Sequence, residues 1–414
     1  MKPTVLLLAT FDTKAEEALY LKKRIEMQGC RVMLMDIGIL EPYEGKLEVQ
    51  AQEVARAGGT ELEELRESRD KGRCIAVMRA GARKLVRLFF EQGRFQGIIG
   101  IGGAQGTEMS TAAMRELPFG VPKFMVSTVA SGRATFGTYV DTKDLILMHS
   151  VADLQGLNVV TRFILDNAAA AVSGMTRVRH LAVRRPAGTR RPAVAVSMLG
   201  TTTPGALRAK GILESNGFEF VAFHQNGTGG IAMEEMIAER LFVGVMDLNL
   251  HEIGDSVFGG LHGSIREGRL ETAGRMGLPQ VVAPGSINYT VQGPLDTLPE
   301  ALRSRRLIVH NPSLTLVRLS IPELQEAGRI VARKLNAARG PVHLFIPLKG
   351  FSFPDREGGP HWEPEGNRAF IEAVKAELDP RVLYDELEAH INDPAFIDPV
   401  AEEFLRMVRN GLGK

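Results

Sequence analysis

Residues 97–107 read Gly-Ile-Ile-Gly-Ile-Gly-Gly-Ala-Gln-Gly-Thr, an apolar run that leads into closely spaced glycines. The run has the length of a buried strand, and the residues that follow suit a turn and the start of a helix. Glycines let the backbone approach an anion closely, and the first turn of a helix offers free amides to a phosphate or carboxylate. The stretch therefore predicts a phosphate-binding turn made by Gly102, Gly103, Gly106 and Thr107. A tight turn without a ligand is the alternative.

This stretch completes neither of two well-known phosphate-binding fingerprints. The dinucleotide pattern G-x-G-x-x-G, counted from Gly100, has Gln105 where the third glycine belongs. The P-loop pattern also fails, because no glycine here precedes a Lys-Ser or Lys-Thr pair at the required spacing. The residues thus indicate an anion-binding turn without specifying the class of nucleotide.

The same alternation of strand and helix extends outward in both directions from this stretch. Short apolar runs that end in Gly, Ser, Thr or Asp are followed by helical periodicity, which is the pattern of a parallel sheet covered by helices. We therefore predict an α/β fold with two Rossmann-like, doubly wound domains, mostly parallel sheets and a cleft between the domains. The predicted strands cover residues 4–10, 31–37, 97–101, 123–127, 193–199, 218–224 and 244–247.

A segment rich in arginine and proline around residues 177–192 interrupts this alternation. It suits a solvated linker, so we predict an N-terminal domain over 1–185 and a C-terminal domain over 192–414. A weak echo of residues 111–142 in residues 272–297 favours a duplicated design.

The amino-acid composition limits which kinds of molecule this protein could bind and where it could act. The chain has 414 residues, a net charge of +1 and 44% apolar residues, which is typical of a soluble globular protein. A near-zero charge argues against nucleic acid as the partner. The chain has no uncharged apolar stretch of 18 residues, so we predict no membrane helix. Two cysteines, Cys30 and Cys74, suit core positions and a reduced cytoplasm.

Three further turns follow predicted strands and are candidates for anion binding. They would lie at the carboxyl ends of parallel strands, where open α/β sheets bind ligands. Helix capping alone is the alternative for each of them; for instance, Thr13 and Glu16 read as a capping box. The candidate residues are Asp12, Thr13 and Lys14, then Thr201, Thr202 and Thr203, then Gly227, Thr228, Gly229 and Gly230.

Among ionisable residues, Asp247 closes a predicted strand and is the candidate ligand for Mg²⁺. His251-Glu-Ile-Gly-Asp255 lacks the second histidine of a zinc-protease helix, so we exclude that class. His251 and Asp255 can still share one helix face, as a metal-binding or acid/base pair or as a surface ion pair. A serine triad is excluded because the chain has no G-x-S-x-G elbow.

Several motifs in order along the chain resemble the UPF0261 family, also called the Tm-1-like ATP-binding proteins after a plant tobamovirus-resistance protein. The family usually has a serine and a glycine where this chain has Ala104 and Gln105. The matching motifs are Thr10-Phe-Asp-Thr-Lys-Ala-Glu-Glu17, Gly102-Gly-Ala-Gln-Gly-Thr107, Lys123-Phe-Met-Val-Ser-Thr128, Ser150-Val-Ala-Asp-Leu-Gln-Gly-Leu-Asn158, Gly227-Thr-Gly-Gly230, His310-Asn-Pro312 and Gly358-Gly-Pro360.

The resemblance implies two Rossmann-like halves, binding of ATP with Mg²⁺, and a homodimer. The leading hypothesis is therefore a cytoplasmic protein that binds ATP or another phosphorylated or acidic small molecule between its halves. One alternative is a metabolic enzyme acting on a sugar acid or phosphoester in the same cleft, with Asp141, His251, Glu252 and His310 as candidate catalytic residues. A protein-binding module is the second alternative.

Overall fold

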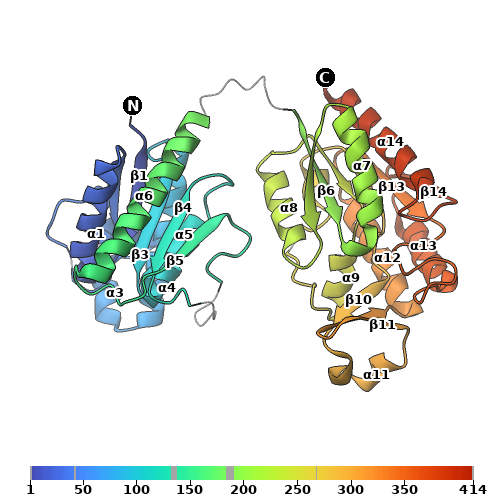
Figure 1. Cartoon of the computed structure of the whole chain (residues 1–414), viewed down its shortest axis with the longest axis horizontal. Helices are drawn as coiled ribbons and strands as arrows, with labels where there is room; N and C mark the ends of the chain where they lie inside the picture. Colours follow the sequence, from blue (N-terminus) through green and yellow to red (C-terminus); the bar gives the residue numbers. More distant parts are fainter. Residues whose placement is uncertain (1, 42, 132–137, 183–190, 267, 413–414) are drawn as a thin grey trace. The chain divides into compact units, whose positions relative to one another are not determined.

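The computed structural model describes residues 2–41, 43–131, 138–182, 191–266 and 268–412. The chain divides into two compact units, Met1–Gly188 and Thr189–Lys414 (Figure 1). The predicted linker falls largely on residues 183–190, which lie outside the described residues. No helix in the described ranges is long and apolar enough to cross a membrane.

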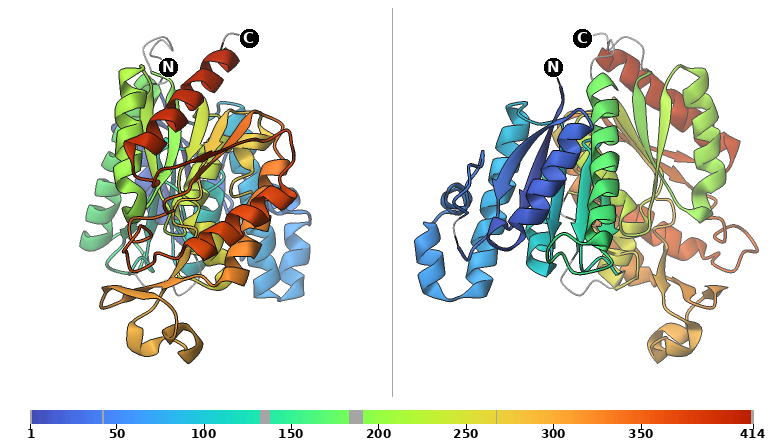
Figure 2. Two further views of the ribbon diagram at one scale, coloured as in Figure 1. Left: turned by 90° about the vertical axis from the view of Figure 1, so that its right-hand side faces the viewer. Right: turned by 60° about the vertical axis from the view of Figure 1, so that its left-hand side comes forward.

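The first unit is a parallel five-stranded sheet with the order β2-β1-β3-β4-β5, covered by helices on both faces. Helices α1 and α6 pack side by side on one face, as the right-hand view of Figure 2 shows in blue and green. The strands are β1 (Thr4–Ala9), β2 (Arg31–Asp36), β3 (Gly97–Gly102), β4 (Lys123–Ser127) and β5 (Leu145–His149), and the helices are α1 (Phe11–Met27), α2 (Ala51–Gly58), α3 (Leu62–Ser68), α4 (Lys71–Glu91), α5 (Ala104–Met114) and α6 (Val159–Ala182).

The continuous apolar run of β1 reflects burial on both faces of this sheet. Val5 and Leu7 pack in the core under α1 and α6, whereas Leu6 and Leu8 pack in the opposite core, with residues of α4 and α5. Central strands of parallel sheets are apolar on both sides for this reason. The predicted α/β class and mostly parallel sheets are confirmed.

The predicted capping box at Thr13 and Glu16 is wrong, because α1 begins at Phe11 with Thr10 as its N-cap. The Thr13 hydroxyl instead contacts the Thr10 carbonyl oxygen at 3.4 Å and the Asp12 carboxylate at 3.2 Å. Asp12, Thr13 and Lys14 therefore lie in the first turn of the helix and not in the loop before it.

The second unit has a parallel six-stranded sheet with the order β14-β13-β9-β8-β6-β7 and a separate antiparallel sheet with the order β10-β12-β11. The parallel strands are β6 (Ala193–Met198), β7 (Glu219–His224), β8 (Gly244–Asp247), β9 (Gln280–Val282), β13 (Val342–Pro347) and β14 (Leu383–Leu387), and the antiparallel strands are β10 (Tyr289–Gln292), β11 (Leu307–Asn311) and β12 (Leu314–Arg318).

The helices of the second unit cover its parallel sheet and follow its strands. Helices α7 and α14 pack together, and so do α12 and α13. The helices are α7 (Thr203–Ser215), α8 (Gly229–Ala238), α9 (His251–Phe258), α10 (Thr272–Arg275), α11 (Glu300–Arg303), α12 (Ile321–Asn336), α13 (Pro364–Glu377) and α14 (Pro394–Leu412), with short 3₁₀ turns at Gly200–Thr202 and Leu295–Thr297.

The first four strands of the two units follow the same order. β2-β1-β3-β4 in one unit corresponds to β7-β6-β8-β9 in the other. The sequence echo falls at equivalent places, since residues 123–127 form β4 and residues 280–282 form β9, the fourth strand of each unit. The shared order is what a duplicated design would produce.

Candidate functional site

The first unit contains a pocket at the point where the order of its strands reverses, between β1 and β3. Strand β1 leads into α1 on one face of the sheet and its neighbour β3 leads into α5 on the other, so the loops after the two strands diverge. Such topological switch points are the usual ligand sites of open α/β sheets. A cavity of about 860 Å³ lies here, and we call it the switch-point pocket. Its walls include Asp12, Thr13, Lys14, Gly103 and Gly106, all predicted from the sequence.

One wall of the pocket is the start of α5. Gly103 is the N-cap residue, and the first amides of a helix have no partner within the helix. A Cβ at Gly102 would lie 2.8 Å from the Gly106 Cα, so packing requires glycine at position 102. A Cβ at Gly103 or Gly106 would come no closer than 3.7 Å or 3.5 Å to its neighbours. Packing within the fold therefore does not require glycine at positions 103 and 106. Because these residues have no side chains, the wall formed by the first amides of α5, here called the amide wall, is left open to the pocket.

Four basic side chains line the same pocket: Lys14, Arg66, Arg69 and Lys71. Lys14 is only 9% exposed, and its Nζ lies 3.4 Å from Gln155 Oε1. Arg66 donates from Nε to the Ile39 carbonyl oxygen at 2.9 Å. Its Nη2 is buried and has no hydrogen-bond partner in the described part of the chain. A buried, unpaired guanidinium nitrogen is costly unless a ligand or water completes it.

The carboxylates near the pocket hold its loops. Asp12 Oδ2 accepts from the amides of Ile39 and Leu40 at 2.9 and 2.8 Å, so Asp12 fixes the segment after β2. Asp36, at the end of β2, accepts through Oδ1 from Phe11 and Gly38, while its buried Oδ2 has no partner among the described residues. Burial raises the pKa of Asp36 to about 6.

We expect Asp36→Asn to stabilise the protein above pH 6 and to leave it unchanged near pH 4. The folded-state pKa lies above the unfolded value of 3.8, so the stability that Asp36 contributes is lost as the pH rises through about 6. A shift of this size corresponds to up to about 3 kcal/mol. Asparagine keeps the Oδ1 acceptor and carries no charge, so urea unfolding measured from pH 4 to 8 should show the difference growing with pH. A difference that does not vary with pH would contradict this assignment.

Gly102 and Thr107, also predicted for this site, lie behind the wall and are fully buried. The Thr107 hydroxyl is 2.7 Å from Ser127 Oγ, which in turn accepts from the Val129 amide. These contacts tie the start of α5 to the end of β4. Thr107 therefore supports the wall from within the fold.

The glycine turn of the second unit already holds an anion, the carboxylate of Glu252. Its Oε1 accepts from the amides of Gly227 and Gly230 at 2.7 and 3.1 Å. Glu252 is fully buried in the first turn of α9. Gly229 starts α8, and a Cβ there would lie 1.8 Å from the His224 carbonyl oxygen. The exposed Thr228 hydroxyl bonds the Asn226 side chain.

Asp247, the predicted ligand for Mg²⁺, is paired with a buried arginine. Arg269 donates to Asp247 Oδ2 from Nη1 at 2.5 Å and to Oδ1 from Nη2 at 2.9 Å. Ser197 Oγ donates to Oδ1 at 2.6 Å. A bidentate guanidinium neutralises the carboxylate and occupies both oxygens, so this arrangement disfavours a second cation at Asp247.

The threonine turn after β6 makes local contacts. The Thr201 hydroxyl lies 2.6 Å from Ser286 Oγ and 2.9 Å from the Tyr289 hydroxyl. The Thr202 hydroxyl accepts from the Leu199 amide and the Thr203 hydroxyl donates to the Leu199 carbonyl oxygen. Thr202 is the N-cap residue of α7, but its side chain makes no capping bond to that helix. Burial raises the pKa of Tyr289 to about 12, so Tyr289 is a neutral hydrogen-bonding group at physiological pH.

The four candidate catalytic residues are divided between the two units. Asp141 belongs to the first unit, where it has a φ of 55° just before β5. His310 is exposed on β11 of the second unit. His251 and Glu252 are neighbours in α9 but face different partners, His262 and Asp255 for His251 and the glycine turn for Glu252.

Sequence reasoning missed three of the four basic side chains of the pocket and two residues of the second unit. Arg66, Arg69 and Lys71 lie between the predicted strands 31–37 and 97–101, and charge alone does not distinguish a pocket wall from a solvated helix face. His262 could have been found, since His251, Asp255 and His262 form the spacing His-x3-Asp-x6-His. Arg269 carries no local signal, because its partners come from distant segments.

The fold and the pocket define an α/β protein built from two Rossmann-like units. The chain belongs to the UPF0261 family: residues 3–181 match the model described as "Uncharacterised protein family (UPF0261) N-terminal domain", and residues 191–408 match that of the C-terminal domain. A UPF0261 protein of Clostridium tetani is 36% identical over 409 residues, covering 99% of this chain and 100% of that protein.

Two other comparisons concern a plant relative and a solved structure. The ToMV resistance protein Tm-1(GCR237) of Solanum lycopersicum is 32% identical over 340 residues, which are 81% of this chain and 45% of that protein. Among solved structures, MurG of Acinetobacter baumannii aligns over 98% of this chain and 100% of that chain, at 11% identity and a TM-score of 0.21. A TM-score this low supports no inference from that structure.

Proposed function

We propose that this protein binds a phosphorylated small molecule in the switch-point pocket of its first unit, with ATP and Mg²⁺ as the leading candidate. The observation that carries the proposal is the convergence of a helix start and four basic side chains on one cavity of about 860 Å³. A volume of this size matches the pockets that hold drug-sized ligands and cofactors.

The chemistry of the walls favours phosphate over a neutral ligand. Lys14, Arg66, Arg69 and Lys71 outnumber the two carboxylates of the lining, Asp12 and Glu41. Backbone amides at a helix start and guanidinium groups are the donors that proteins use for phosphate oxygens. Arg66 also contributes a guanidinium to this lining.

The residues present can also accommodate Mg²⁺. This ion is usually held by one or two carboxylates together with substrate phosphates and waters. Glu41 and Asp12 are the carboxylates that line the pocket and would hold the ion, which would neutralise phosphate charge. A cytoplasmic location and a homodimer remain predictions.

A titration of the full chain with ATP, ADP, AMP and inorganic phosphate, with and without Mg²⁺, tests this proposal. Ligand bound to the folded state raises the melting temperature by mass action, and calorimetry then gives the affinity. We expect a Mg²⁺-dependent stabilisation with ATP. A shift with sugar acids or sugar phosphates and none with nucleotides would keep the pocket but replace ATP as its ligand. No shift with any of these anions would overturn the proposal.

Two variants locate the binding. Gly106→Ala places a methyl group on the amide wall, and Arg69→Ala removes an exposed guanidinium from the rim; each should weaken binding about 10-fold, since a charged hydrogen bond contributes about 1.5–3 kcal/mol. Gly106→Ala should change stability by no more than about 1 kcal/mol. Matched controls are Gly174→Ala in α6, where a Cβ meets nothing within 4 Å, and Arg73→Ala, whose exposed side chain is outside the pocket. Equal affinity in all four variants would rule out this pocket.

A further inference from the structure

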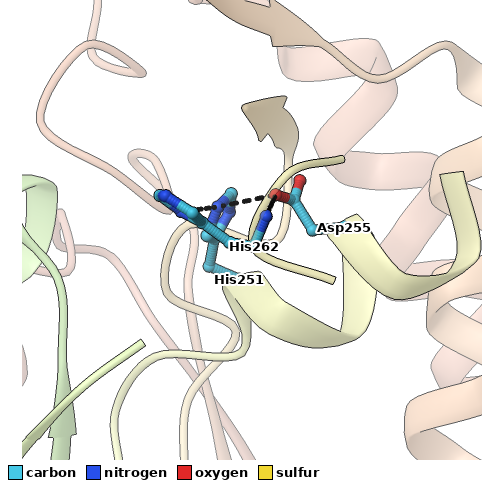
Figure 3. A group of neighbouring side chains, drawn as sticks. All are labelled: His251, Asp255 and His262. Carbon is cyan, nitrogen blue, oxygen red and sulfur yellow. Dashed lines mark hydrogen bonds and ion pairs between the residues drawn. The ribbon is translucent and has the colours of Figure 1, made fainter. Parts of the chain in front are cut away.

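We propose that His251, Asp255 and His262 of the second unit form a binding site for one divalent transition-metal ion, with zinc as the best-fitting ion. His251 and Asp255 project from successive turns of α9, and His262 comes from the loop that follows this helix (Figure 3). One donor atom from each residue lies within 4.8 Å of the other two. The site is separate from the switch-point pocket, so neither proposal depends on the other.

The spacing of the donor atoms matches a tetrahedral ion. His251 Nε2 lies 3.4 Å from Asp255 Oδ2 and 3.3 Å from His262 Nδ1. Zinc bonds to nitrogen and oxygen are about 2.0–2.1 Å long, which places tetrahedral ligands about 3.3–3.4 Å apart. Two edges of the required tetrahedron are therefore already present in the fold.

The neighbouring groups orient these donors as in known metal centres. His251 Nδ1 lies 3.2 Å from the Ser286 carbonyl oxygen, an acceptor, so this contact assigns the ring proton to Nδ1 and leaves the Nε2 lone pair facing the cluster. Asp255 Oδ1 accepts from the Val291 amide at 3.0 Å, and Oδ2 accepts from the His262 amide at 2.9 Å. Such hydrogen bonds, from an imidazole to a backbone carbonyl and from backbone amides to a carboxylate, are typical of the shell around metal ligands.

The charge around Asp255 also favours a cation. Its side chain is fully buried, and in the described ranges the basic side chain within 4.0 Å of its carboxylate is the imidazole of His251, with no arginine or lysine beside it. Asp247 in the same unit differs, because Arg269 neutralises it. A buried carboxylate is costly without a positive partner, and a divalent ion would supply one.

The three donor residues favour one class of metal ion and leave a coordination position that the protein does not fill. Two imidazoles and one carboxylate suit zinc, iron or cobalt better than magnesium or calcium, which prefer oxygen ligands. Three protein ligands leave a fourth position for water or a substrate, as in catalytic zinc sites. His262 is only partly buried, whereas His251 and Asp255 are fully buried.

The test uses full-length protein stripped of metal with a chelator. Zn²⁺ is titrated against a chromophoric competitor, and Co²⁺ is added as a spectroscopic probe of coordination. We expect one equivalent of Zn²⁺ per chain, a visible Co²⁺ spectrum of a four- or five-coordinate site, and a higher melting temperature with metal.

His262→Gln should weaken Zn²⁺ binding at least about 100-fold and abolish the Co²⁺ spectrum, since even outer residues of such sites contribute 10- to 100-fold. His262 is half-buried, so this variant should fold, and its melting temperature without metal checks that. His310→Gln is the matched control, because His310 is an exposed histidine of the same unit outside the cluster. Equal Zn²⁺ affinity in wild type, His262→Gln and His310→Gln, or no bound metal at all, would overturn the proposal.

Discussion

Replacing Arg269 with methionine should lower the free energy of unfolding of the second unit by about 3–5 kcal/mol, the usual loss when one partner of a buried ion pair is removed. Arg269 is 1% exposed and donates to Asp247 through both terminal nitrogens. Burial opposes its charge, but the carboxylates of Asp247, Glu234 and Glu252 raise the pKa of Arg269. Methionine would fill the space and leave these carboxylates buried without their cation.

The reach of the Arg269 side chain explains why the effect is large. Its Nη2 also donates to Gln225 Oε1 at 2.7 Å and to the Asn249 carbonyl oxygen at 3.1 Å, and its Nε lies 3.4 Å from Glu252 Oε2. The side chain thus joins the segments that follow β7 and β8 to α9. Removing it leaves several buried polar atoms unpaired at once.

Urea unfolding of Arg269→Met beside Arg208→Met gives the measurement and its control. Arg208 pairs with Asp398, but both side chains are exposed, so its loss should lower stability far less than the loss of Arg269. The deficit of Arg269→Met should also shrink at acid pH, because protonation removes the unpaired negative charges. Similar small losses in both variants would show that the buried network contributes little.

Gly230→Ala should be equally damaging, with a loss of several kcal/mol or a failure to fold. A Cβ at position 230 would lie 1.8 Å from Glu252 Oε2 and 3.0 Å from Arg269 Nε. The Glu252 carboxylate is held there by the amides of Gly227 and Gly230, so it cannot move away without losing both bonds. Overpacking of a filled interior costs about 1–3 kcal/mol, and the displaced buried charge adds to this.

Gly211→Ala is the matched control for this substitution. Gly211 lies within α7 of the same unit, and a Cβ there meets nothing within 4 Å. Alanine should stabilise that helix by up to about 1 kcal/mol, because it is the better helix former. Thermal unfolding of the two variants should therefore shift in opposite directions; a normal melting temperature for Gly230→Ala would mean that the Glu252 contact is dispensable.

The seven predicted strands, which form β1–β4 and β6–β8, could be found from the sequence because the responsible signals are local. The runs that form β1, β3 and β4 are apolar on both faces and end in polar or glycine residues, which determines both strand type and burial. The candidate turns after β1 and β3 were also predicted, because glycines and a Thr-Lys pair follow those strands directly. These strands and turns can be recognised without knowing which distant side chains they contact.

The use of each turn could not be predicted, because it depends on residues far away in sequence. Gly103 and Gly227 follow similar strands, yet one lines a pocket and the other bonds Glu252, 25 residues further on. The pairing of Asp247 with Arg269 spans 22 residues and needs the fold to bring them together. A sequence pattern indicates which residues can donate hydrogen bonds, but not whether a ligand or a distant side chain accepts those bonds.

Glu252 gives the second unit a ligand that never dissociates. Because the carboxylate is tethered to the same chain, it competes with any dissolved anion at an effective concentration on the order of millimolar or higher. The glycine turn of that unit is therefore filled in the folded chain without any dissolved anion. Under the proposed function, only the first unit would respond to the supply of phosphorylated metabolites in the cell, while the second unit would remain equally ordered in starved and in fed cells.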